Sequence, residues 1–322
     1  MPTVAITDYS FDDLSIETPI LTGKGLTVTS QKTGKDQAKL IELVKDADAV
    51  IAQFAPINAE VIASLRRAKV IVRYGIGVDN VDLKAAAAKG IPVSNIPDYC
   101  IDEVADHTLA AILDLVRRNT SNVLKVKNGG WGLAVPVTSI QSLKNLTVGV
   151  VAFGRIAREV VARVKAFKAK VLVYDPVVDP AVIIAAGAIP VTLDELYRTS
   201  DLITLHCPSL ESTKYLINAQ SIAKLKDGVL LVNTSRGTLI RTDDLVAALK
   251  SGKVAAAALD VTDPEPPPAD HPLLKLDNVF ITAHIASYSP QAVWRLRSQA
   301  AESAAVVLTG GKAVNVVNGI KG

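Results

Sequence analysis

The hydrophobic positions of the chain alternate between short β-branched runs and longer stretches in which apolar residues recur every three or four positions. Short continuous apolar runs indicate strands that are buried on both faces, and the longer stretches indicate amphipathic helices. An alternation of strands and helices favours parallel sheets built from βαβ units. The sequence therefore predicts an α/β fold.

The alternation occurs twice along the chain, which predicts two α/β units. In the first unit, strands are expected at 3–7, 48–53, 69–75 and 91–95, with helices at 37–47 and 57–68. A long helix is expected at 101–120, followed by the turn KNGGWG. In the second unit, strands are expected at 147–153, 169–175, 202–206, 228–233, 254–261 and 278–284. A last helix at 289–310 is expected to pack back on the first unit.

Composition and charge exclude several function classes. Hydrophobic residues make up 49% of the 322 positions, but no apolar run approaches the length of about 18 residues that crosses a bilayer. The start, MPTVAITDYS, lacks the basic and apolar regions of a signal peptide. The net charge of +3 is spread along the chain, so neither a nucleic-acid nor a membrane partner is expected. The chain has only two cysteines, Cys100 and Cys207, which lie far apart, and this excludes a disulfide framework and a cysteine zinc site. No metal is therefore expected. The low cysteine content favours a cytoplasmic location.

The stretch VVAFGRIAREV at 150–160 has the spacing of a dinucleotide-binding turn, with Ala152, Gly154 and Ala157 at its three glycine positions. Gly154 allows the backbone to approach a pyrophosphate, and alanine is accepted at the third position. A Cβ at Ala152 costs little if φ is negative and more if the turn requires positive φ. A strand-to-helix turn without a ligand is the alternative interpretation.

Asp175 favours the dinucleotide interpretation because it ends the next strand, KVLVYDP. A carboxylate at this position can accept hydrogen bonds from both ribose hydroxyls of NAD and repels the 2′-phosphate of NADP. No arginine follows in DPVVDP. The sequence therefore predicts an NAD site.

Polar residues follow three later strands. Arg236 comes directly after one strand, Asp260 ends the next with Glu265 five residues later, and His284 ends the last. Taken singly, Arg236 could form a surface ion pair, Glu265 could be a charge in a loop, and His284 could be a capped strand end. Because the carboxyl ends of parallel strands meet at one edge, these residues are expected to converge where the nicotinamide binds.

These motifs together resemble the D-isomer-specific 2-hydroxyacid dehydrogenase family over nearly the whole chain. The resembling blocks, in family order, are VRYGIGVDNVDLKAAAAKGIPVSNIPDYC, EVADHTLAAIL, GRIAREVVARVKAFKAKVLVYDP, LHCPSLESTKYLI, VNTSRGTLI, ALDVTDPEP and AHIASYSP. Two stretches, NIPDYCIDEVADHTL and AHIASYS, resemble the branch that contains the C-terminal-binding-protein corepressors. The resemblance implies two Rossmann-like domains with parallel sheets. Residues 1–100 with 288–322 would form a flavodoxin-like substrate-binding domain, and residues 101–287 the NAD-binding Rossmann domain.

The family implies an NAD-dependent oxidoreductase that interconverts a small 2-keto acid and its D-2-hydroxy acid. The guanidinium of Arg236 would donate to the substrate carboxylate and carbonyl at once. His284 would supply the proton to the carbonyl oxygen, because imidazole titrates near neutral pH. Glu265, if hydrogen-bonded to the imidazole, would favour its protonated form and fix its orientation.

The resemblance also implies a set of binding residues. Asp260 would contact the nicotinamide carboxamide, Arg155 and Ile156 would donate main-chain amides to the pyrophosphate, and His206–Pro208 would line the adenine side. The remaining residues expected at the cofactor are Gly154, Asp175, Cys207, Thr213, Thr234, Ser235 and Ala286. Gly75, Ile76 and Gly77 resemble the family turn whose amides bind the substrate carboxylate.

The loop Gln53–Ala55 bears on the substrate. Family members that act on 3-phosphoglycerate carry arginines here, whereas this chain has Gln53, Phe54 and Ala55. A buried dianion without a cation is costly, so we expect the pocket to reject phosphorylated acids in favour of glyoxylate, hydroxypyruvate or a modest apolar 2-keto acid. Phe54 would offer apolar surface to the substrate, together with Tyr74, Tyr288 and Trp131 of a partner chain.

Two questions stay open at the level of sequence. The corepressor-like branch allows a dinucleotide-sensing scaffold or regulator as an alternative, although the complete Arg, Glu and His set favours an enzyme. A homodimer is expected, because Trp131 follows the turn where family dimers carry an interface segment. The side chain of Trp131 could reach the active site of the partner chain or could serve only for packing.

His107, within an apolar helix, is interpreted as a core or cap residue.

Overall fold

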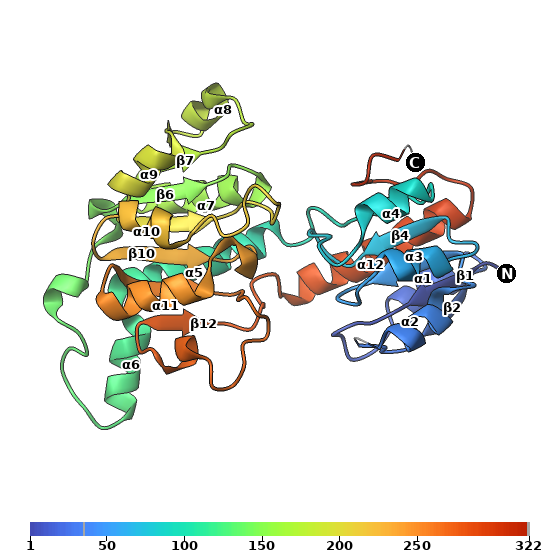
Figure 1. The fold of residues 1–322 in the computed structure, drawn as a ribbon, viewed down its shortest axis with the longest axis horizontal. Helices are drawn as coiled ribbons and strands as arrows, with labels where there is room; N and C mark the ends of the chain where they lie inside the picture. The colour runs from blue at the N-terminus through green and yellow to red at the C-terminus, as the bar shows by residue number, and fades with distance from the viewer. Residues whose placement is uncertain (35, 321–322) are drawn as a thin grey trace. The chain divides into compact units, whose positions relative to one another are not determined.

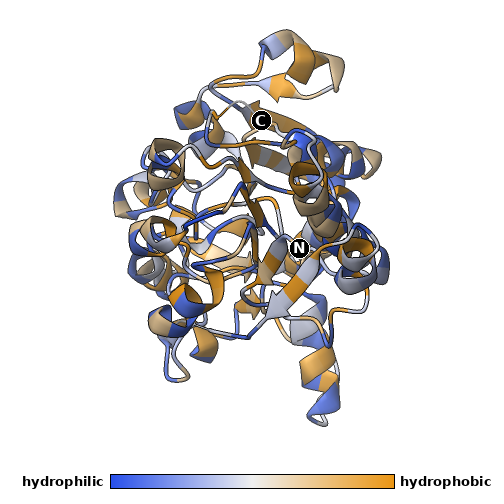
Figure 2. Cartoon of the chain, turned by 90° about the vertical axis from the view of Figure 1, so that its right-hand side faces the viewer, coloured by the Kyte–Doolittle hydropathy of each residue, from blue (hydrophilic) through white to orange (hydrophobic). Residues whose placement is uncertain are grey.

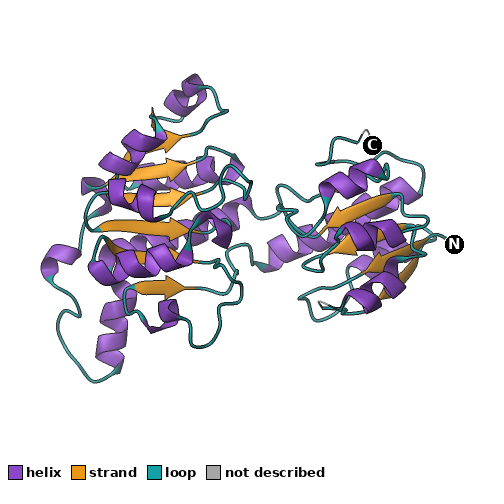
Figure 3. Cartoon of the chain, in the orientation of Figure 1, coloured by secondary structure: helices purple, strands orange, loops and turns teal. Residues whose placement is uncertain are grey.

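The computed structural model describes residues 1–34 and 36–320 and shows two compact units (Figure 1). Unit 1 comprises Met1–Tyr99 and the segment from Ser289 on, and unit 2 comprises Cys100–Tyr288. Each unit is a parallel sheet with helices on both faces (Figure 3). No helix in the described ranges combines the length and apolar character needed to cross a membrane.

Unit 1 has the strand order β2-β1-β3-β4-β5, which is that of the flavodoxin-like fold that the family resemblance implied. The strands are β1 (Thr3–Ile6), β2 (Thr27–Ser30), β3 (Ala49–Ala52), β4 (Val70–Arg73) and β5 (Val93–Ser94), and all neighbouring pairs are parallel. The helices are α1 (Glu17–Thr22), α2 (Gln37–Val44), α3 (Ala59–Ser64), α4 (Leu83–Ala88) and α12 (Pro290–Leu308). The edge strand β2 was not predicted, because its residues are largely exposed and leave no apolar run.

Unit 2 has the strand order β12-β11-β10-β9-β6-β7-β8, again all parallel. The strands are β6 (Thr147–Val151), β7 (Lys170–Tyr174), β8 (Ile189–Pro190), β9 (Leu202–Leu205), β10 (Val229–Asn233), β11 (Val254–Leu259) and β12 (Val279–Ile281). The helices are α5 (Ile101–Arg117), α6 (Asn119–Lys127), α7 (Arg155–Ala166), α8 (Pro180–Ala185), α9 (Leu193–Thr199), α10 (Ala219–Lys224) and α11 (Thr242–Ser251), with short 3₁₀ turns η1 (Val137–Ser139), η2 (Leu143–Asn145), η3 (Gly237–Leu239) and η4 (Pro272–Lys275). Strands are added outward from β6 in one direction and then, from β9, in the other, which is the Rossmann arrangement.

The helix expected at 101–120 is two helices. Arg118 has a left-handed φ of 55° and separates α5 from α6. The side chain of Asp114 stabilises this break by accepting hydrogen bonds from the amide and hydroxyl of Thr120, both at 2.9 Å. In Figure 1, α6 extends away from the sheet of unit 2.

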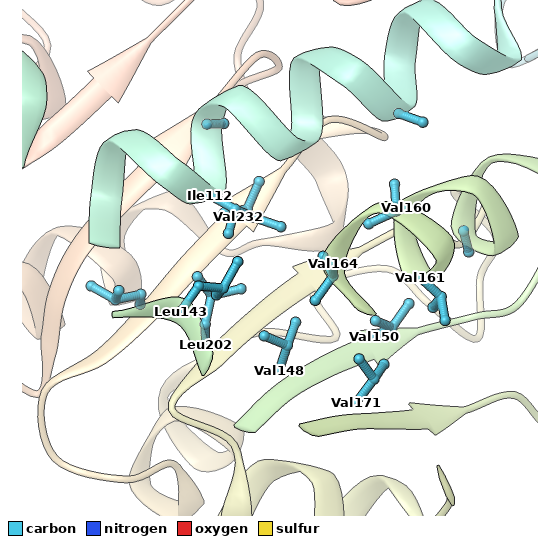
Figure 4. Packing of buried hydrophobic residues seen from close by; sticks show 14 of the residues in the cluster. Ile112, Leu143, Val148, Val150, Val160, Val161, Val164, Val171, Leu202 and Val232 are labelled. Atoms are coloured by element: carbon cyan, nitrogen blue, oxygen red, sulfur yellow. The ribbon is translucent and has the colours of Figure 1, made fainter. Parts of the chain in front are cut away.

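Valines of β6 and α7 pack together in the core of unit 2. Figure 4 shows Val148 and Val150 of β6 facing Val160, Val161 and Val164 of α7. Other members of this cluster come from α5, β7, β9 and β10, and include Ile112, Val171, Leu202 and Val232. The strands carry mostly hydrophobic residues, while the helices carry both classes (Figure 2). This packing fixes the amino end of α7 relative to the sheet, and the candidate site lies there.

A buried charged cluster ties α12 to α1 in unit 1. The guanidinium of Arg297, 6% exposed, donates from Nε and Nη2 to the two oxygens of Glu17, which is 0% exposed, at 2.9 and 2.7 Å. The hydroxyl of Tyr74 also donates to Glu17 Oε1, at 2.9 Å. Burial, and then the charge of Glu17, raise the pKa of Tyr74 well above its ordinary value. The expectation that Tyr74 lines a substrate pocket is therefore wrong, because its side chain is enclosed in this cluster.

We expect Arg297→Leu to destabilise unit 1 by about 3–5 kcal/mol, because it leaves the Glu17 carboxylate buried without its cation. Trp294 in α12 reports on unit 1 when Trp131, the other of the two tryptophans, is replaced by phenylalanine. Denaturant unfolding followed by Trp294 fluorescence measures the change. Arg66→Leu, which removes an exposed ion pair with Asp46, is the control and should shift stability by about 0.5 kcal/mol or less. Equal effects of the two substitutions would contradict the structural role of the buried pair.

Candidate active site

The carboxyl ends of the parallel strands of unit 2 meet at one edge of the sheet. Most residues that the sequence analysis proposed for the cofactor and the chemistry follow a strand of this unit at that edge. Ala152 and Gly154 follow β6, Asp175 follows β7, His206 follows β9, Thr234, Ser235 and Arg236 follow β10, Asp260 follows β11, and His284 follows β12. Parallel pairing alone therefore brings them to one side of the unit.

The turn after β6 is open to an anionic ligand. Gly154 is the N-cap of α7, and within the described chain no side chain caps this helix end. A Cβ built on Gly154 would meet no atom within 4 Å, so the space before the helix is open. The amides of the first turn, which include those of Arg155 and Ile156, are the groups that bind phosphates at helix amino ends. This geometry fits the pyrophosphate of a dinucleotide.

Ala152 adopts the more strained of the two conformations considered for the turn. Its φ is 73°, in the left-handed region that favours glycine. Its amide donates to Tyr174 O on the neighbouring strand at 2.7 Å, which holds the residue in place. Ala157, at the third position, is 1% exposed and packs helix against strand.

Asp175 is held as an ionised carboxylate beside this turn. Burial raises its pKa, but hydrogen bonds from backbone amides outweigh burial, and the pKa lies below its usual value. Oδ2 accepts from the amide of Phe153 at 2.7 Å, and Oδ1 accepts from those of Val177 and Val178 at 2.8 and 2.9 Å. A carboxylate has about four acceptor sites, so a ribose hydroxyl would be received mainly at Oδ2.

The segment after β9 is partly buried, and the side chains of His206 and Cys207 in it are uncharged. Burial lowers the pKa of His206 to about 4, and its Nε2 lies 2.9 Å from Thr204 Oγ1. Burial raises the pKa of the Cys207 thiol to about 11, so it remains protonated. The hydroxyl of Thr213 donates to Pro208 O at 2.7 Å and shapes the loop rather than pointing out of it.

Several predicted cofactor residues make hydrogen bonds inside the protein. Ser235 Oγ donates to Leu205 O at 2.9 Å, and Thr234 Oγ1 lies 2.9 Å from Thr108 Oγ1. The amide of Ala286 donates to Asp260 Oδ2 at 2.9 Å. These contacts fix the turns after β10 and β12.

Glu265 and His284 are joined by a short contact. Glu265 Oε1 lies 2.6 Å from His284 Nδ1. Burial raises the pKa of Glu265, but the hydrogen bond and charge of His284 outweigh burial and lower it, and the charge of Arg236 lowers it further. The three side chains therefore share one electrostatic environment, with the imidazole Nε2 turned away from the carboxylate. No group of three or more potential metal ligands occurs in the described residues.

The loop that carries Glu265 packs closely against the backbone directly after Arg236. A Cβ on Gly237 would lie 1.9 Å from Thr262 O, so only glycine fits directly after Arg236. On the other side, Thr242 Oγ1 and Tyr215 OH donate to Asp263 at 2.6 and 3.3 Å. The loop 262–265 is thereby packed between η3 and these side chains.

The turn that carries His284 is held by Asp260. His284 has a φ of 55°, which is unfavourable for a residue other than glycine. Asp260, 3% exposed, offsets this cost by accepting from the amides of Ile285 and Ala286, both at 2.9 Å, and its backbone oxygen accepts from the amide of His284 at 2.8 Å. The described contacts of Asp260 thus position His284, a role that the sequence analysis did not assign.

In unit 1, Arg73 is the residue that the sequence analysis missed. Phe54 is 55% exposed, and the guanidinium carbon of Arg73 lies 5.9 Å from its ring centroid. Gly75, at φ 141°, also lies against Arg73, since a Cβ there would be 1.5 Å from Nη1. The premise that Phe54 has no cationic neighbour is therefore wrong. Arg73 ends the apolar strand β4, whereas Arg236 lies shortly after β10, and a polar residue at a strand end is the pattern that could have revealed it.

The Gly75–Gly77 turn and the Phe54 loop are both ordered by hydrogen bonds. The amide of Gly75 donates to Arg73 O at 2.9 Å, and Asn95 Nδ2 donates to Ile76 O at 2.6 Å. Asp8 caps the other loop by accepting from the amides of Gln53, Phe54 and Ala55 at 3.0, 2.6 and 3.1 Å. Both segments are therefore preorganised at the carboxyl ends of β3 and β4.

Comparison with known proteins agrees with this geometry. The family model described as "D-isomer specific 2-hydroxyacid dehydrogenase, NAD binding domain" matches residues 109–286. The chain is 39% identical to a D-3-phosphoglycerate dehydrogenase of Archaeoglobus fulgidus over 89% of its own length but only 54% of that protein. It is 38% identical to a hydroxypyruvate reductase of Thermotoga maritima, over 84% of this chain and 87% of that protein. The chain thus spans about half the length of the phosphoglycerate dehydrogenases that it matches.

A solved structure shares the fold over both units. The D-lactate dehydrogenase of Aquifex aeolicus, solved with NAD and lactic acid, matches with a TM-score of 0.85 and 32% identity, over 95% of this chain and 96% of that one. The proteins named here are all enzymes, and none supports the alternative interpretation as a regulator.

We expect Ala152→Gly to stabilise unit 2 by about 1 kcal/mol, because glycine adopts the positive φ of this turn without steric cost. Denaturant unfolding monitored by circular dichroism measures the change. Ala157→Gly, inside α7, is the matched control and should destabilise by about 1 kcal/mol or more. The same sign for both substitutions would mean that Ala152 is not strained.

The stability of unit 2 should depend on His206 in mildly acidic solution. The folded pKa of about 4 lies below the unfolded value of about 6.5, so between these limits the unfolded chain binds a proton that the folded chain does not. The free energy of unfolding should therefore fall by about 2 kcal/mol from pH ~7 to pH ~5 through this residue alone. Urea unfolding of His206→Gln should show a correspondingly smaller loss over the same range. Identical losses in both proteins would show that His206 accepts a proton while folded.

Proposed function

Because the chain belongs to the D-isomer-specific 2-hydroxyacid dehydrogenase family, we propose that it reduces a small 2-keto acid to the D-2-hydroxy acid with NADH. The observation that carries the proposal is the 2.6 Å contact between His284 and Glu265 beside Arg236, at the strand edge that also carries the open helix end of α7. These are the groups that a carbonyl reduction requires: an anion-binding cation, a proton donor and a cofactor site.

The roles follow from the chemistry of each side chain. Bound NADH supplies the reducing equivalent for the carbonyl carbon. Arg236 binds the substrate carboxylate and carbonyl oxygen with its forked donors, which stabilises negative charge as it develops on that oxygen. His284 delivers a proton from Nε2 to the same oxygen, while Glu265 holds Nδ1 and so fixes the ring orientation.

The cofactor contacts in this proposal follow the turns of the sheet edge. The first-turn amides of α7, including those of Arg155 and Ile156, receive the pyrophosphate, and Asp175 receives the adenosine ribose. Its negative charge disfavours the 2′-phosphate of NADP. His206, Cys207 and Pro208 line the adenine side, since the neutral state of the first two suits an uncharged ring.

We propose hydroxypyruvate or glyoxylate as the preferred substrate. The match to a hydroxypyruvate reductase along most of both chains supports this choice, and so does the loop Gln53–Ala55, which carries no arginine. In unit 1, Phe54 and the amides of Gly75–Gly77 would contact the substrate. The nearby guanidinium of Arg73 makes a phosphorylated acid the decisive competitor.

The proposal is tested by NADH oxidation against glyoxylate, hydroxypyruvate, pyruvate, 2-ketoisocaproate, phenylpyruvate and 3-phosphohydroxypyruvate. The expected result is the highest kcat/KM for hydroxypyruvate or glyoxylate. A higher value for the phosphorylated acid would overturn the substrate assignment, and no oxidation with any acid would overturn the reaction.

Glu265→Gln should move the alkaline limit of the reduction pH profile to lower pH. The pKa of Glu265 is lowered by His284, so the side chain is a carboxylate across the neutral range and favours a protonated imidazole. The neutral amide of glutamine removes that charge but retains a hydrogen-bond acceptor. His284→Ala should lose most turnover at every pH and still bind NADH, which fluorescence titration measures. An unchanged profile in Glu265→Gln would remove Glu265 from the mechanism.

We further propose that the protein is a cytoplasmic homodimer. Large apolar side chains are exposed on α6 and the segment after it, at Val123, Leu124, Val126, Trp131, Leu133 and Val137. A patch of this kind is typical of a protein interface, and a second copy of the chain is the partner we expect. Cys100 and Cys207 form no disulfide within the described residues, which fits a reducing compartment.

Light scattering should give the mass of a dimer for the wild type and of a monomer for Leu124→Asp. Ile184→Asp, which places the same charge on the exposed surface of α8, should remain dimeric. Dissociation by both substitutions, or by neither, would contradict the assignment of the interface to α6.

A further inference from the structure

Two adjacent residues of α5, His107 and Thr108, each contact one of the turns that carry the candidate catalytic side chains. His107 Nε2 lies 3.1 Å from Thr282 Oγ1, two residues before His284. Thr108 Oγ1 lies 2.9 Å from Thr234 Oγ1, two residues before Arg236. The helix therefore reaches the turn after β12 with one residue and the turn after β10 with the next.

The hydrogen-bond direction at His107 follows from its partners. Thr282 Oγ1 donates its single proton to Asp260 Oδ1, 2.5 Å away, because a carboxylate only accepts. The Thr282 oxygen is then an acceptor, so His107 must donate from Nε2. Asp260 Oδ1 also accepts from the amide of Ile285 at 2.9 Å. A directed chain thus runs from His107 through Thr282 and Asp260 to the turn that holds His284.

The direction at Thr108 is fixed in the same way. Its hydroxyl donates to Val104 O within α5 at 2.7 Å, so its oxygen accepts the proton of Thr234. Thr108 is 0% exposed, which means that water does not replace it as the partner of Thr234. The neighbouring Ser235 donates its hydroxyl to Leu205 O at 2.9 Å, so the turn before Arg236 is held from two sides.

Strain explains why the turn of His284 needs this support. His284 is held at a φ of 55°, and such a conformation persists only where the surroundings enforce it. Asp260 supplies the acceptors, but its carboxylate must itself be oriented. Thr282, fixed by His107, provides the side-chain donor that does so.

We propose that His107 and Thr108 are positioning residues through which α5 separately holds the proton donor His284 and the substrate-binding Arg236. The proposal rests on the proposed function for its kinetic effects, but not for its structural ones. Neither residue touches substrate or cofactor in this account. His107 acts through Thr282 and Asp260, and Thr108 acts through Thr234.

Loss of the two contacts should affect different kinetic constants. His107→Leu should lower kcat by about tenfold and leave KM for the keto acid little changed, because one lost hydrogen bond of about 1.4 kcal/mol misplaces the proton donor. Thr108→Val should mainly raise KM, because it loosens the turn of Arg236 while preserving side-chain shape. His107→Gln, whose Nε2 can donate to Thr282, should restore most of kcat. Thr108→Ser, which keeps the hydroxyl, should restore KM.

Amide hydrogen exchange tests the same proposal without turnover. In the protein without substrate, His107→Leu should speed exchange at Ile285 and Ala286 but not at Ser235, whose amide donates to Asn233 Oδ1 at 3.0 Å. Thr108→Val should do the reverse. Asp106→Asn, on the same helix but paired with Arg163, should change neither exchange nor kinetics.

The outcomes separate the two proposals. Selective exchange effects in a protein that reduces no keto acid would retain the positioning role and overturn the proposed function. Exchange that rises equally at both turns in either variant would show general destabilisation and overturn the positioning role. Wild-type exchange and kinetics in His107→Leu and Thr108→Val would overturn it as well.

Discussion

Parallel hydrogen bonding in the sheet of unit 2 is the constraint on which the candidate site depends. Because all seven strands run in one direction, the residue after each strand lies at the same edge, whatever its distance along the chain. The open helix end after β6 and the carboxylate after β7 then lie on one side of β9, and Arg236 and His284 lie on the other. A site for a dinucleotide and a site for carbonyl chemistry are therefore built by one architectural rule.

Two turns at the same edge have strained backbone conformations, and neighbouring strand ends stabilise both turns. Ala152 and His284 both have left-handed φ values, 73° and 55°. In each case a group from the adjacent strand end accepts the amide proton: Tyr174 O for Ala152 and Asp260 O for His284. The rigid sheet thus enforces two turns that the residues would not adopt on their own.

Local sequence patterns predicted those features of the fold and site that neighbouring residues determine. Buried strands, the Gly154 turn and the polar residues after strands were visible because each has a short-range signature. The exposed strand β2 has none, and neither does the break at Arg118, where the Asp114 side chain stabilises the turn by accepting a hydrogen bond from Thr120, six residues away. The contact between His107 and Thr282 joins residues 175 positions apart, and only the folded structure reveals it. Resemblance to a family supplied the pairing of Glu265 with His284, which spacing alone did not determine.

A crystal structure of the ternary complex with NADH and oxamate, an unreactive analogue of pyruvate, would test the central claim most directly. The account predicts that Arg236 donates to the carboxylate and carbonyl oxygen of oxamate, and that His284 Nε2 lies within about 3 Å of that carbonyl oxygen. Glu265 should still contact Nδ1. Oxamate bound away from Arg236, or a His284 ring whose Nε2 faces away from the ligand, would contradict the assignment of these three residues to the reduction of a 2-keto acid.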